Sequence, residues 1–272
     1  MIHILLKSGI FQMMIPSKII VVANQKGGVG KTTTAVNIST ALAAVNRRVL
    51  LVDFDPQGNA STGVGILKKN KHNTSYDLLI KRCTVSECLT KSSIPGLTVI
   101  PAGIQLMGAE IELVNVENRE SIFKTLIEPY KEIYDYIVID CPPSMGLLTL
   151  NAMVAADSVL VPLQCEYYAL EGLSYLLNSI QKIKKNLNSK LDLFGIVLTM
   201  YDKRSSLCEQ VSQDVRFHLK EKVFKTVIPR NIKVSEAPSH GKPVLLYDVK
   251  CMGSQSYMEL AKEIINKEKD YE

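Results

Sequence analysis

The sequence predicts an α/β fold: a doubly wound, mainly parallel sheet flanked by helices on both faces. Short runs that are apolar throughout recur along the chain, which is typical of strands buried on both sides. Stretches with helical spacing lie between these runs, and that alternation favours parallel strands joined by right-handed crossovers. The expected strands are residues 19–23, 48–53, 97–100, 136–140, 158–162 and 193–199. The expected helices are residues 33–44, 75–80, 84–89, 117–132, 170–187, 206–219 and 254–267.

Length and composition agree with one globular domain. The 272 residues are 46% hydrophobic and 22% charged, a balance that excludes a disordered chain. No internal repeat or interdomain linker is present, so we expect residues 18–272 to form a single domain. Residues 1–17 match no motif, and Lys7 and Gly9 interrupt their apolar runs. We therefore expect an irregular extension there, and neither a signal peptide nor a membrane span.

Cysteine usage and charge point to a compartment and to a class of partner. The six cysteines form no C-x-x-C pair, which favours reduced thiols in a cytosol. The formal net charge is +5, and residues 201–250 hold ten Lys/Arg against six Asp/Glu. A basic excess in one segment suggests a polyanion partner, although a solvated surface explains the charge equally well.

The stretch of residues 24–34 has the context of a phosphate-binding loop. It reads Asn-Gln-Lys-Gly-Gly-Val-Gly-Lys-Thr-Thr-Thr, and it stands between the first strand and the first helix. Glycines allow backbone N–H groups to surround phosphate oxygens, and the helix N-terminus adds partial positive charge. Lys31 would then reach the β- and γ-phosphates, and the Thr32 hydroxyl would bind Mg²⁺.

The loop departs from the generic motif at two positions. Gln25 stands where that motif has its first glycine, and a second lysine, Lys26, follows it. Because Lys31 is already expected to bind the phosphates, we expect Lys26 to have a different role. The Lys-Gly-Gly-Val-Gly-Lys-Thr arrangement resembles the deviant Walker A box of the ParA/MinD ATPases. That resemblance implies a lysine that reaches across a dimer interface to the partner's nucleotide.

Three carboxylates are expected beside the loop. Asp53 ends the second strand and Asp55 follows it, while Asp140 ends the strand of residues 136–140. The carboxyl ends of parallel strands form the crevice in which α/β sheets bind ligands. We expect Asp140 to hold Mg²⁺ directly or through water, and Asp53 to support either the metal or the switch geometry. Asp55 is our candidate for orienting the attacking water.

Further motifs extend the resemblance from residue 18 onward, and they point to the chromosomal ParA (Soj) branch. The matching stretches are residues 24–34, 52–60, 140–144, 164–173, 226–231 and 235–243. The resemblance implies ATP with Mg²⁺ rather than GTP. It implies phosphate binding by Gly27, Gly28, Val29, Gly30, Lys31, Thr32 and Thr33, with the adenine near Met200, Pro229, Arg230 and Asn231.

The resemblance also implies partners. In family terms, two ATP-bound subunits form a sandwich homodimer that binds double-stranded DNA without sequence preference, and a ParB-type protein stimulates hydrolysis. The DNA-contacting positions fall on Arg204 and Lys233, with Lys250 as a third candidate. Met252 stands where relatives tend to carry a basic residue, so one DNA contact is expected to be weaker. The implied location is cytoplasmic, nucleoid-associated when ATP is bound, with no stable membrane association.

Alternative functions within this superfamily stay open at this point. A MinD-like positioning ATPase ends in a lysine-rich amphipathic helix, whereas residues 263–272 here are too acidic to favour anionic lipid. An iron–sulfur carrier ATPase needs cysteines at the dimer seam, and Cys141 is the only cysteine beside the expected site. For a small-molecule ligase or kinase, the sequence indicates no dedicated substrate pocket.

Overall fold

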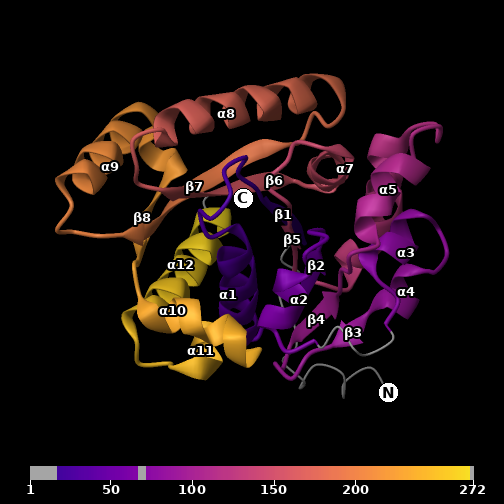
Figure 1. Cartoon of the computed structure of the whole chain (residues 1–272), viewed down its shortest axis with the longest axis horizontal. Coiled ribbons are helices and arrows are strands. Elements are labelled where there is room, and N and C mark those ends of the chain that lie inside the picture. Colours follow the sequence, from indigo (N-terminus) through magenta and orange to yellow (C-terminus); the bar gives the residue numbers. More distant parts are fainter. Residues whose placement is uncertain (1–16, 67–71, 270–272) are drawn as a thin grey trace, which may run out of the picture.

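The computed structural model describes residues 17–66 and 72–269 (Figure 1). Most of the expected extension, residues 1–16, therefore lies outside the described part of the chain. One sheet of eight strands has the order β3-β4-β2-β5-β1-β6-β7-β8, and every neighbouring pair is parallel except β3 with β4. The strands are β1 (Lys18–Val22), β2 (Val49–Asp53), β3 (Thr90–Lys91), β4 (Leu97–Ile100), β5 (Tyr136–Asp140), β6 (Ser158–Gln164), β7 (Asp192–Tyr201) and β8 (Val223–Pro229).

Helices cover both faces of this sheet, as the doubly wound prediction requires. One layer contains α1 (Lys31–Ala44), α2 (Asn59–Gly63), α10 (Ile232–Glu236), α11 (Val244–Tyr247) and α12 (Met252–Lys269). The other contains α3 (Ser75–Leu79), α4 (Val85–Cys88), α5 (Leu106–Glu112), α6 (Ile122–Ile127), α7 (Leu147–Ala155), α8 (Ala169–Asn186) and α9 (Ser206–Leu219). Short 3₁₀ turns occupy Arg119–Ser121, Glu128–Glu132, Lys220–Lys222 and Ala237–His240.

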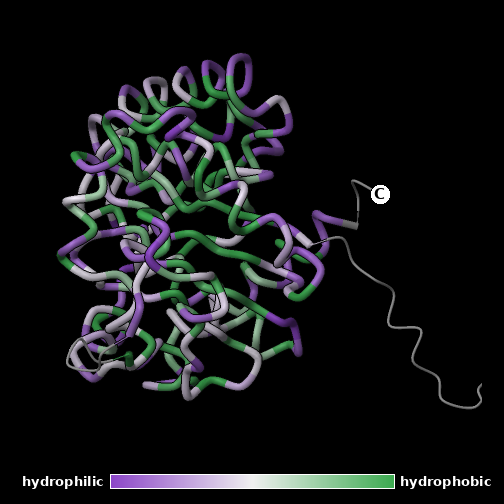
Figure 2. The backbone as a smooth tube through the Cα atoms, turned by 90° about the vertical axis from the view of Figure 1, so that its right-hand side faces the viewer, coloured by the Kyte–Doolittle hydropathy of each residue, from purple (hydrophilic) through white to green (hydrophobic). Residues whose placement is uncertain are grey.

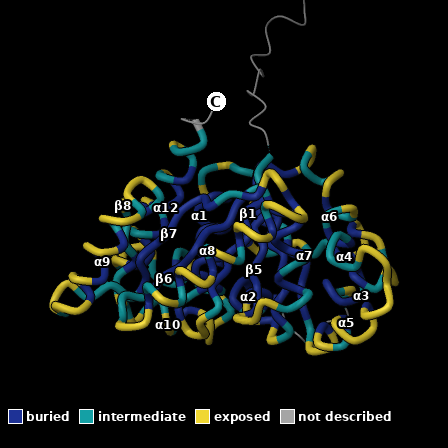
Figure 3. Tube along the Cα trace, turned by 90° about the horizontal axis from the view of Figure 1, so that it is seen from above, coloured by how far each residue is buried: buried dark blue, intermediate teal, exposed yellow. Residues whose placement is uncertain are grey.

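The apolar strands supply two cores, one on each side of the sheet. Ile19 and Val21 pack into the core under α6, α7 and α8, whereas Ile20 and Val22 pack into the core under α1 and α12. Successive strand residues point to opposite faces, so a strand buried on both sides is apolar at every position. Figure 2 shows hydrophobic strands running through the middle of the molecule, and Figure 3 shows the same strands buried.

The six expected strands are present, and two further strands were not predicted. β8 is the last strand of the sheet and is only partly buried, and the exposed Lys225 interrupts its apolar run. β3 is only two residues long. Helices α2, α5, α7, α10 and α11 were also not predicted. Four of these five have seven residues or fewer, too short for a clear helical period.

The prediction of one amphipathic helix over residues 117–132 is wrong. The structure has a 3₁₀ turn, the short helix α6 and a second 3₁₀ turn there. Asn118 adopts φ +53°, a left-handed conformation that a continuous helix does not contain. Pro129 lacks a backbone N–H and sits in the second 3₁₀ turn, so it interrupts the helical hydrogen bonding after Ile127.

Candidate functional site

The loop between β1 and α1 has a backbone path that depends on glycine. Gly28 adopts φ +76° and Gly30 adopts φ +87°, and Gly30 is the N-cap of α1. Residues with a side chain rarely adopt this left-handed region, whereas glycine does so at little cost. The loop therefore leads directly into the N-terminus of α1, where backbone N–H groups and the helix dipole favour an anion.

Lys31 is buried at the first position of α1 and turns back over the loop. Its side-chain Nζ donates a hydrogen bond to the backbone oxygen of Lys26 at 2.8 Å. Burial lowers the pKa of the Lys31 ammonium, and the nearby charges of Asp140 and Asp55 oppose that shift. The two lysines of the loop are thus held close together, one by its side chain and the other by its backbone.

The side chain of Lys26 forms an ion pair with Glu166, which follows β6 in the same chain. The backbone N–H of Lys26 donates to Asn24 Oδ1 at 3.0 Å, and Asn24 Nδ2 donates to the backbone oxygen of Pro162 at 2.8 Å. The Lys26 side chain is 45% exposed. Sequence reasoning placed Glu166 in a family motif but assigned it no role, because nothing in the motif indicates the contact with Lys26.

Asp53 and Asp140 lie side by side because β2 and β5 pair in register at these two residues. Asp53 is completely buried and accepts three hydrogen bonds, from Asp55 N, Ser61 N and Ser61 Oγ, at 3.1, 2.8 and 2.7 Å. Burial raises the pKa of Asp53 to about 6, although these hydrogen bonds lower it. Sequence analysis did not identify Ser61, since a serine eight residues downstream carries no recognisable signal.

Asp140 differs from Asp53 in its hydrogen bonding. It is completely buried, and neither carboxylate oxygen accepts a hydrogen bond among the described residues. Burial raises the pKa of Asp140 well above its usual range, and the charge of Asp53 adds to the shift, while the adjacent Thr32 hydroxyl opposes it. Buried charges are normally paired or bound to metal, so this pair of oxygens fits a divalent cation.

No three His, Cys, Asp or Glu side chains come together as a metal-binding group in the part of the chain that the structure describes. Mg²⁺ at nucleotide sites is usually held by one or two protein oxygens together with water and phosphates. Thr32 and Asp140 suit that mode. The three hydrogen bonds to Asp53 leave it less available as a ligand and instead tie β2 to α2.

Asp55 lies two residues beyond the end of β2, in the turn that leads to α2. Its Oδ1 accepts a hydrogen bond from Gln57 N at 2.9 Å, and its backbone oxygen accepts one from Gly58 N at 2.8 Å. Gly58 adopts φ +62° and caps α2. Residues 56–59 thus form a tight turn around Asp55.

The four residues expected near the adenine come together with the loop. A cavity of about 80 Å³ is lined by Met200, Pro229, Arg230 and Asn231 as well as Gly30, Thr33, Thr199, Ile228, Val234, Ser235 and Tyr257. Thr199 Oγ1 donates to the backbone oxygen of Val29 at 2.8 Å, which joins β7 to the loop. Met200 adopts φ +49°, and such conformations concentrate at ligand sites.

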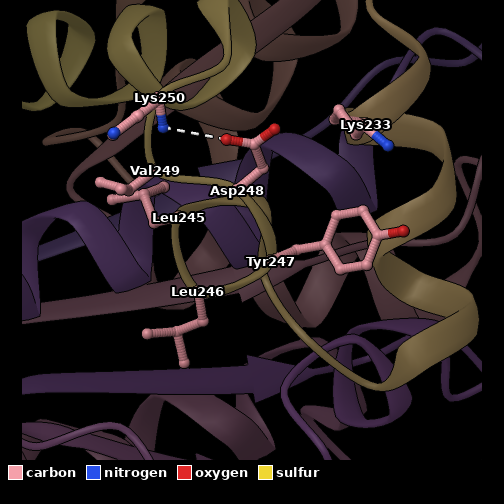
Figure 4. A pocket seen from close by; sticks show the side chains of 7 residues that line it. All are labelled: Lys233, Leu245, Leu246, Tyr247, Asp248, Val249 and Lys250. Atoms are coloured by element: carbon pink, nitrogen blue, oxygen red, sulfur yellow. Dashed lines mark hydrogen bonds between the residues drawn. The ribbon is translucent and has the colours of Figure 1, made fainter.

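The predicted DNA-binding residues divide into two places. Lys233 and Lys250 line an open hollow of about 550 Å³ together with residues 245–249 (Figure 4). Lys233 pairs with Glu236 at 3.0 Å, and Figure 4 shows the two lysines on opposite sides of Asp248. Arg204 lies outside this hollow, in the turn between β7 and α9, where it pairs with Asp202 at 3.0 Å with its side chain 89% exposed.

Known proteins resemble this chain over almost its whole length. Residues 17–193 match the family model described as an AAA domain. The chain is 54% identical over 257 residues to the chromosome partitioning protein ParA of Caulobacter vibrioides strain NA1000 / CB15N, covering 94% of this chain and 96% of that protein. It is 54% identical over 247 residues to the sporulation initiation inhibitor protein Soj of Bacillus subtilis strain 168, covering 91% and 98%. The chain belongs to the ParA/Soj family.

A solved structure shares the fold of this chain. The cobyrinic acid a,c-diamide synthase of Mycobacterium smegmatis with bound ATP analog and magnesium superimposes with a TM-score of 0.82 at 35% identity, covering 94% of this chain and 97% of that one. The ParA/Soj resemblance stated from the motifs is therefore confirmed, and with it the P-loop ATPase class. Within residues 17–66 and 72–269, no helix combines the length and apolar character needed to span a bilayer.

Proposed function

We propose that this ParA/Soj-family chain is an ATP-driven partitioning ATPase: it forms a sandwich homodimer on ATP, binds double-stranded DNA without sequence preference and hydrolyses ATP when a ParB-type partner engages it. The observation that carries the proposal is the second lysine of the loop. Lys26 stands at the loop's outer side, 45% exposed, and makes its ion pair with Glu166 rather than with Asp53, Asp55 or Asp140. A cation placed there suits a nucleotide on a facing subunit.

The chain's own groups position the phosphates. The loop N–H groups and the N-terminus of α1 neutralise phosphate charge, and Lys31 exchanges its bond to the Lys26 backbone oxygen for β- and γ-phosphate oxygens. Thr32 and Asp140 would hold Mg²⁺, which supplies further neutralisation of the phosphates when bound. The adenine would enter the cavity between Met200 and residues 229–231.

Hydrolysis then depends on two further side chains. Asp55 would orient the attacking water, because its carboxylate stands just beyond the end of β2 and next to Lys31 and Asp140. Lys26 from the facing subunit would stabilise charge at the γ-phosphate, in the manner of an arginine finger. Asp53 would keep α2 and the turn of residues 56–59 in place through Ser61. An isolated subunit has no Lys26 from a facing subunit at its phosphates, so we expect the monomer to hydrolyse ATP slowly.

The DNA surface of the proposal consists of Arg204, Lys233 and Lys250. The ion pairs of Arg204 and Lys233 with neighbouring carboxylates are exposed, and such pairs contribute little and exchange readily for a phosphate. A dimer presents each residue twice, and ATP drives dimerisation in this proposal. We therefore expect DNA binding to require ATP. The location that follows is cytoplasmic, on the nucleoid when ATP is bound.

Two alternatives receive less support from the described residues. In a MinD-like protein the C-terminal helix would offer an apolar face to lipid, but here Leu260, Ala261 and Ile264 of α12 are buried against the sheet. In an iron–sulfur carrier a cysteine would reach the dimer seam, but Cys141 is completely buried. Both observations favour partitioning over membrane positioning or cluster transfer.

The test is a measurement of ATPase rate with no addition, with DNA, with a ParB-type protein and with both. We expect a slow basal rate that increases at least about tenfold only when both are present, since assembly gates the site. Sedimentation with ATP should detect a dimer that ADP does not support. A rate insensitive to DNA and partner, or a monomer under every nucleotide condition, would contradict the proposal.

A further inference from the structure

Two cysteine thiols touch each other beside α4, at the edge of the molecule. Cys83 Sγ and Cys88 Sγ are 2.8 Å apart, and both are free thiols. A disulfide bond is about 2.05 Å long, so the two sulfurs need to approach by about 0.8 Å to form one. Cys83 directly precedes Thr84, the N-cap of α4, and Cys88 is the last residue of that helix. Figure 1 shows α4 beside α3, at the end of the molecule where β3 lies.

The two thiols differ in their access to solvent. Cys88 is 1% exposed, and its Sγ donates a hydrogen bond to the backbone oxygen of Thr74 at 3.6 Å. Cys83 is partly exposed, so an oxidant in solvent meets Cys83 first and Cys88 stands behind it as a second thiol. Redox-sensitive cysteines are often paired with a resolving cysteine in this way. Burial raises the pKa of both thiols, so they are protonated near neutral pH and react more slowly than a thiolate.

We propose that Cys83 and Cys88 form a reversible oxidation site, a dithiol that hydrogen peroxide converts to a disulfide across α4. In the first step the Cys83 sulfur attacks one peroxide oxygen, the O–O bond breaks, and a sulfenic acid and one water molecule form. In the second step the Cys88 sulfur attacks the Cys83 sulfur, the S–O bond breaks, and the disulfide and a second water molecule form. The thiols give up two electrons and two protons, which the peroxide takes. A small dithiol returns them through a mixed disulfide.

The disulfide would stabilise a helix that has little stability of its own. α4 has four residues, and its N-terminus is held by a capping box between Thr84 and Glu87. Helices this short depend on contacts outside themselves. A disulfide between Cys83 and Cys88 closes a ring around α4 and restricts the conformations of this segment when it opens. β3 begins two residues after Cys88, so the same ring would restrain the entry to the edge strand of the sheet.

Helix α3 connects the thiol pair to the nucleotide edge of the sheet. Thr74, whose backbone oxygen accepts the Cys88 thiol, is the N-cap of α3. The next residue, Ser75, donates its Oγ to the backbone oxygen of Asp53 at 2.8 Å. Disulfide formation removes the Cys88 S–H, so the Thr74 oxygen loses that donor and keeps the bond from Leu78 N at 3.0 Å. Oxidation therefore changes a contact one residue away from the one that joins α3 to Asp53.

The experiment is peroxide oxidation of the full-length chain followed by peptide mapping. The reduced chain is exposed to millimolar hydrogen peroxide, alkylated with iodoacetamide and digested with trypsin. Cleavage after Arg82 and Lys91 places both thiols in one peptide, residues 83–91, which has no other cysteine. We expect this peptide to carry two alkyl groups before oxidation. After oxidation it should carry none and be lighter than the unmodified peptide by two hydrogen atoms, and dithiothreitol should restore both alkylation sites.

Hydrogen exchange measures the structural effect independently. The backbone N–H groups of Glu87 and Leu89 donate to the oxygens of Thr84 and Val85 and close α4. In the oxidised chain we expect these two amides to exchange at least about tenfold more slowly than in the reduced chain, because the ring opposes local opening. Exchange that is the same in both redox states would overturn the stabilising role of the disulfide.

Cys83→Ser removes the more exposed thiol and keeps a side chain of similar size. It should show neither the loss of two hydrogen atoms nor the slower exchange, and Cys88→Ser should behave alike; thermal melts should show that both are folded. Cys251→Ser is the matched control, because the Cys251 thiol contacts a hydroxyl, Ser254 Oγ at 3.5 Å, rather than a second thiol. It should oxidise at residues 83–91 like the parent chain.

Three results would overturn the inference. One is a peptide of residues 83–91 that still carries two alkyl groups after peroxide. Another is a sulfinic acid on Cys83, which dithiothreitol does not reverse. The third is a disulfide found only between Cys165 and Cys208, whose thiols also interact and which fall in other tryptic peptides. The inference does not depend on the proposed function, since neither readout involves ATP turnover, DNA or a partner protein.

Discussion

The ammonium of Lys26 is paired with the carboxylate of Glu166 within one chain. The lysine that distinguishes this phosphate loop from the generic one is therefore held at the loop's outer side by a residue that follows β6. That pairing gives the lysine a defined position before any second subunit arrives. It also provides an ion pair that can be removed by mutation without altering the loop.

Lys26→Ala should retain ATP binding and lose turnover. Lys31, Thr32 and the loop N–H groups remain in place for the nucleotide, whereas the cation proposed to act on the facing subunit is gone. We expect ATPase activity with DNA and partner to fall on the order of 10²-fold, as for removal of one transition-state donor. Nucleotide affinity measured by calorimetry should change little. Normal hydrolysis together with normal dimerisation would show that Lys26 has no role in trans.

Glu166→Gln should favour the dimer. Lys26 must break its ion pair with Glu166 before it can reach the nucleotide of the facing subunit. The substitution removes that carboxylate and keeps a side chain of similar size. An exposed pair of this kind contributes at most about 1 kcal/mol, so ATP-driven dimerisation should tighten by about two- to fivefold. Sedimentation equilibrium with ATP measures the change. Glu171→Gln, on the nearby helix α8, is the control, and weaker dimerisation of Glu166→Gln would mean that Glu166 itself contacts the other subunit.

Asp55→Ala should bind Mg²⁺ and ATP but not hydrolyse it. Asp55 stands in the turn before α2 rather than in the phosphate loop, and its oxygens accept hydrogen bonds from the backbone N–H groups of Gln57 and Gly58. We expect turnover to fall on the order of 10²-fold and the ATP-bound dimer to persist in gel filtration. Weakened ATP affinity would place Asp55 among the binding residues, and unchanged turnover would assign water orientation to another group.

The variant Arg204→Ala, Lys233→Ala should weaken DNA binding equally on unrelated duplexes. Each side chain is proposed to bind one phosphate, so the salt dependence of log affinity should flatten by about 0.9 for each phosphate that is no longer neutralised. Gel-shift titrations at several salt concentrations measure both effects. Lys185→Ala, an exposed lysine in the last turn of α8, serves as the charge control. Parent-like affinity in the double variant, or a strong preference for one duplex, would contradict the assignment.

Asp135→Asn should destabilise the fold in a pH-dependent way. Burial acts to raise the pKa of Asp135, but the hydrogen bonds from Arg48 outweigh it, so the pKa lies below its usual range. A carboxyl whose pKa is lower in the folded state stabilises the protein above about pH 4 and loses that effect as pH falls. We expect the free energy of unfolding to fall by about 1.5–3 kcal/mol at pH 7.

The measurement for Asp135 is denaturant unfolding at pH 7 and at the lowest pH where the parent chain is folded. The difference between Asp135→Asn and the parent chain should shrink as pH falls, because the parent carboxyl becomes protonated. Asp214→Asn, at an exposed position on α9, should differ from the parent at neither pH. A difference that is constant with pH would mean that the Arg48 contact acts through packing and not through charge.

Much of the fold could be predicted because its signals are local. Each strand buried on both faces must be apolar at successive positions, so the runs at 19–23 and 136–140 identify strands without reference to any neighbour. The glycines and Lys31 stand at neighbouring positions of one loop, and the spacing alone indicates phosphate chemistry. Short elements escaped prediction for the opposite reason. α2 and α10 have five residues each, and their helical conformation depends on what they pack against.

The sequence by itself determined which residue types stand at the strand ends, and therefore the class of chemistry. Only the tertiary structure decided which side chains interact. Lys26 pairs with Glu166, and Ser61 donates a hydrogen bond to Asp53. Asp140 has no hydrogen-bond partner among the described residues. The tertiary structure also decided that Met107 and Ile111 of α5 face solvent while Leu106 and Ala109 of the same helix face the core. The physical reason is that these relationships join residues from different strands and loops. Sheet order and register set their distances, and neither is encoded in local spacing.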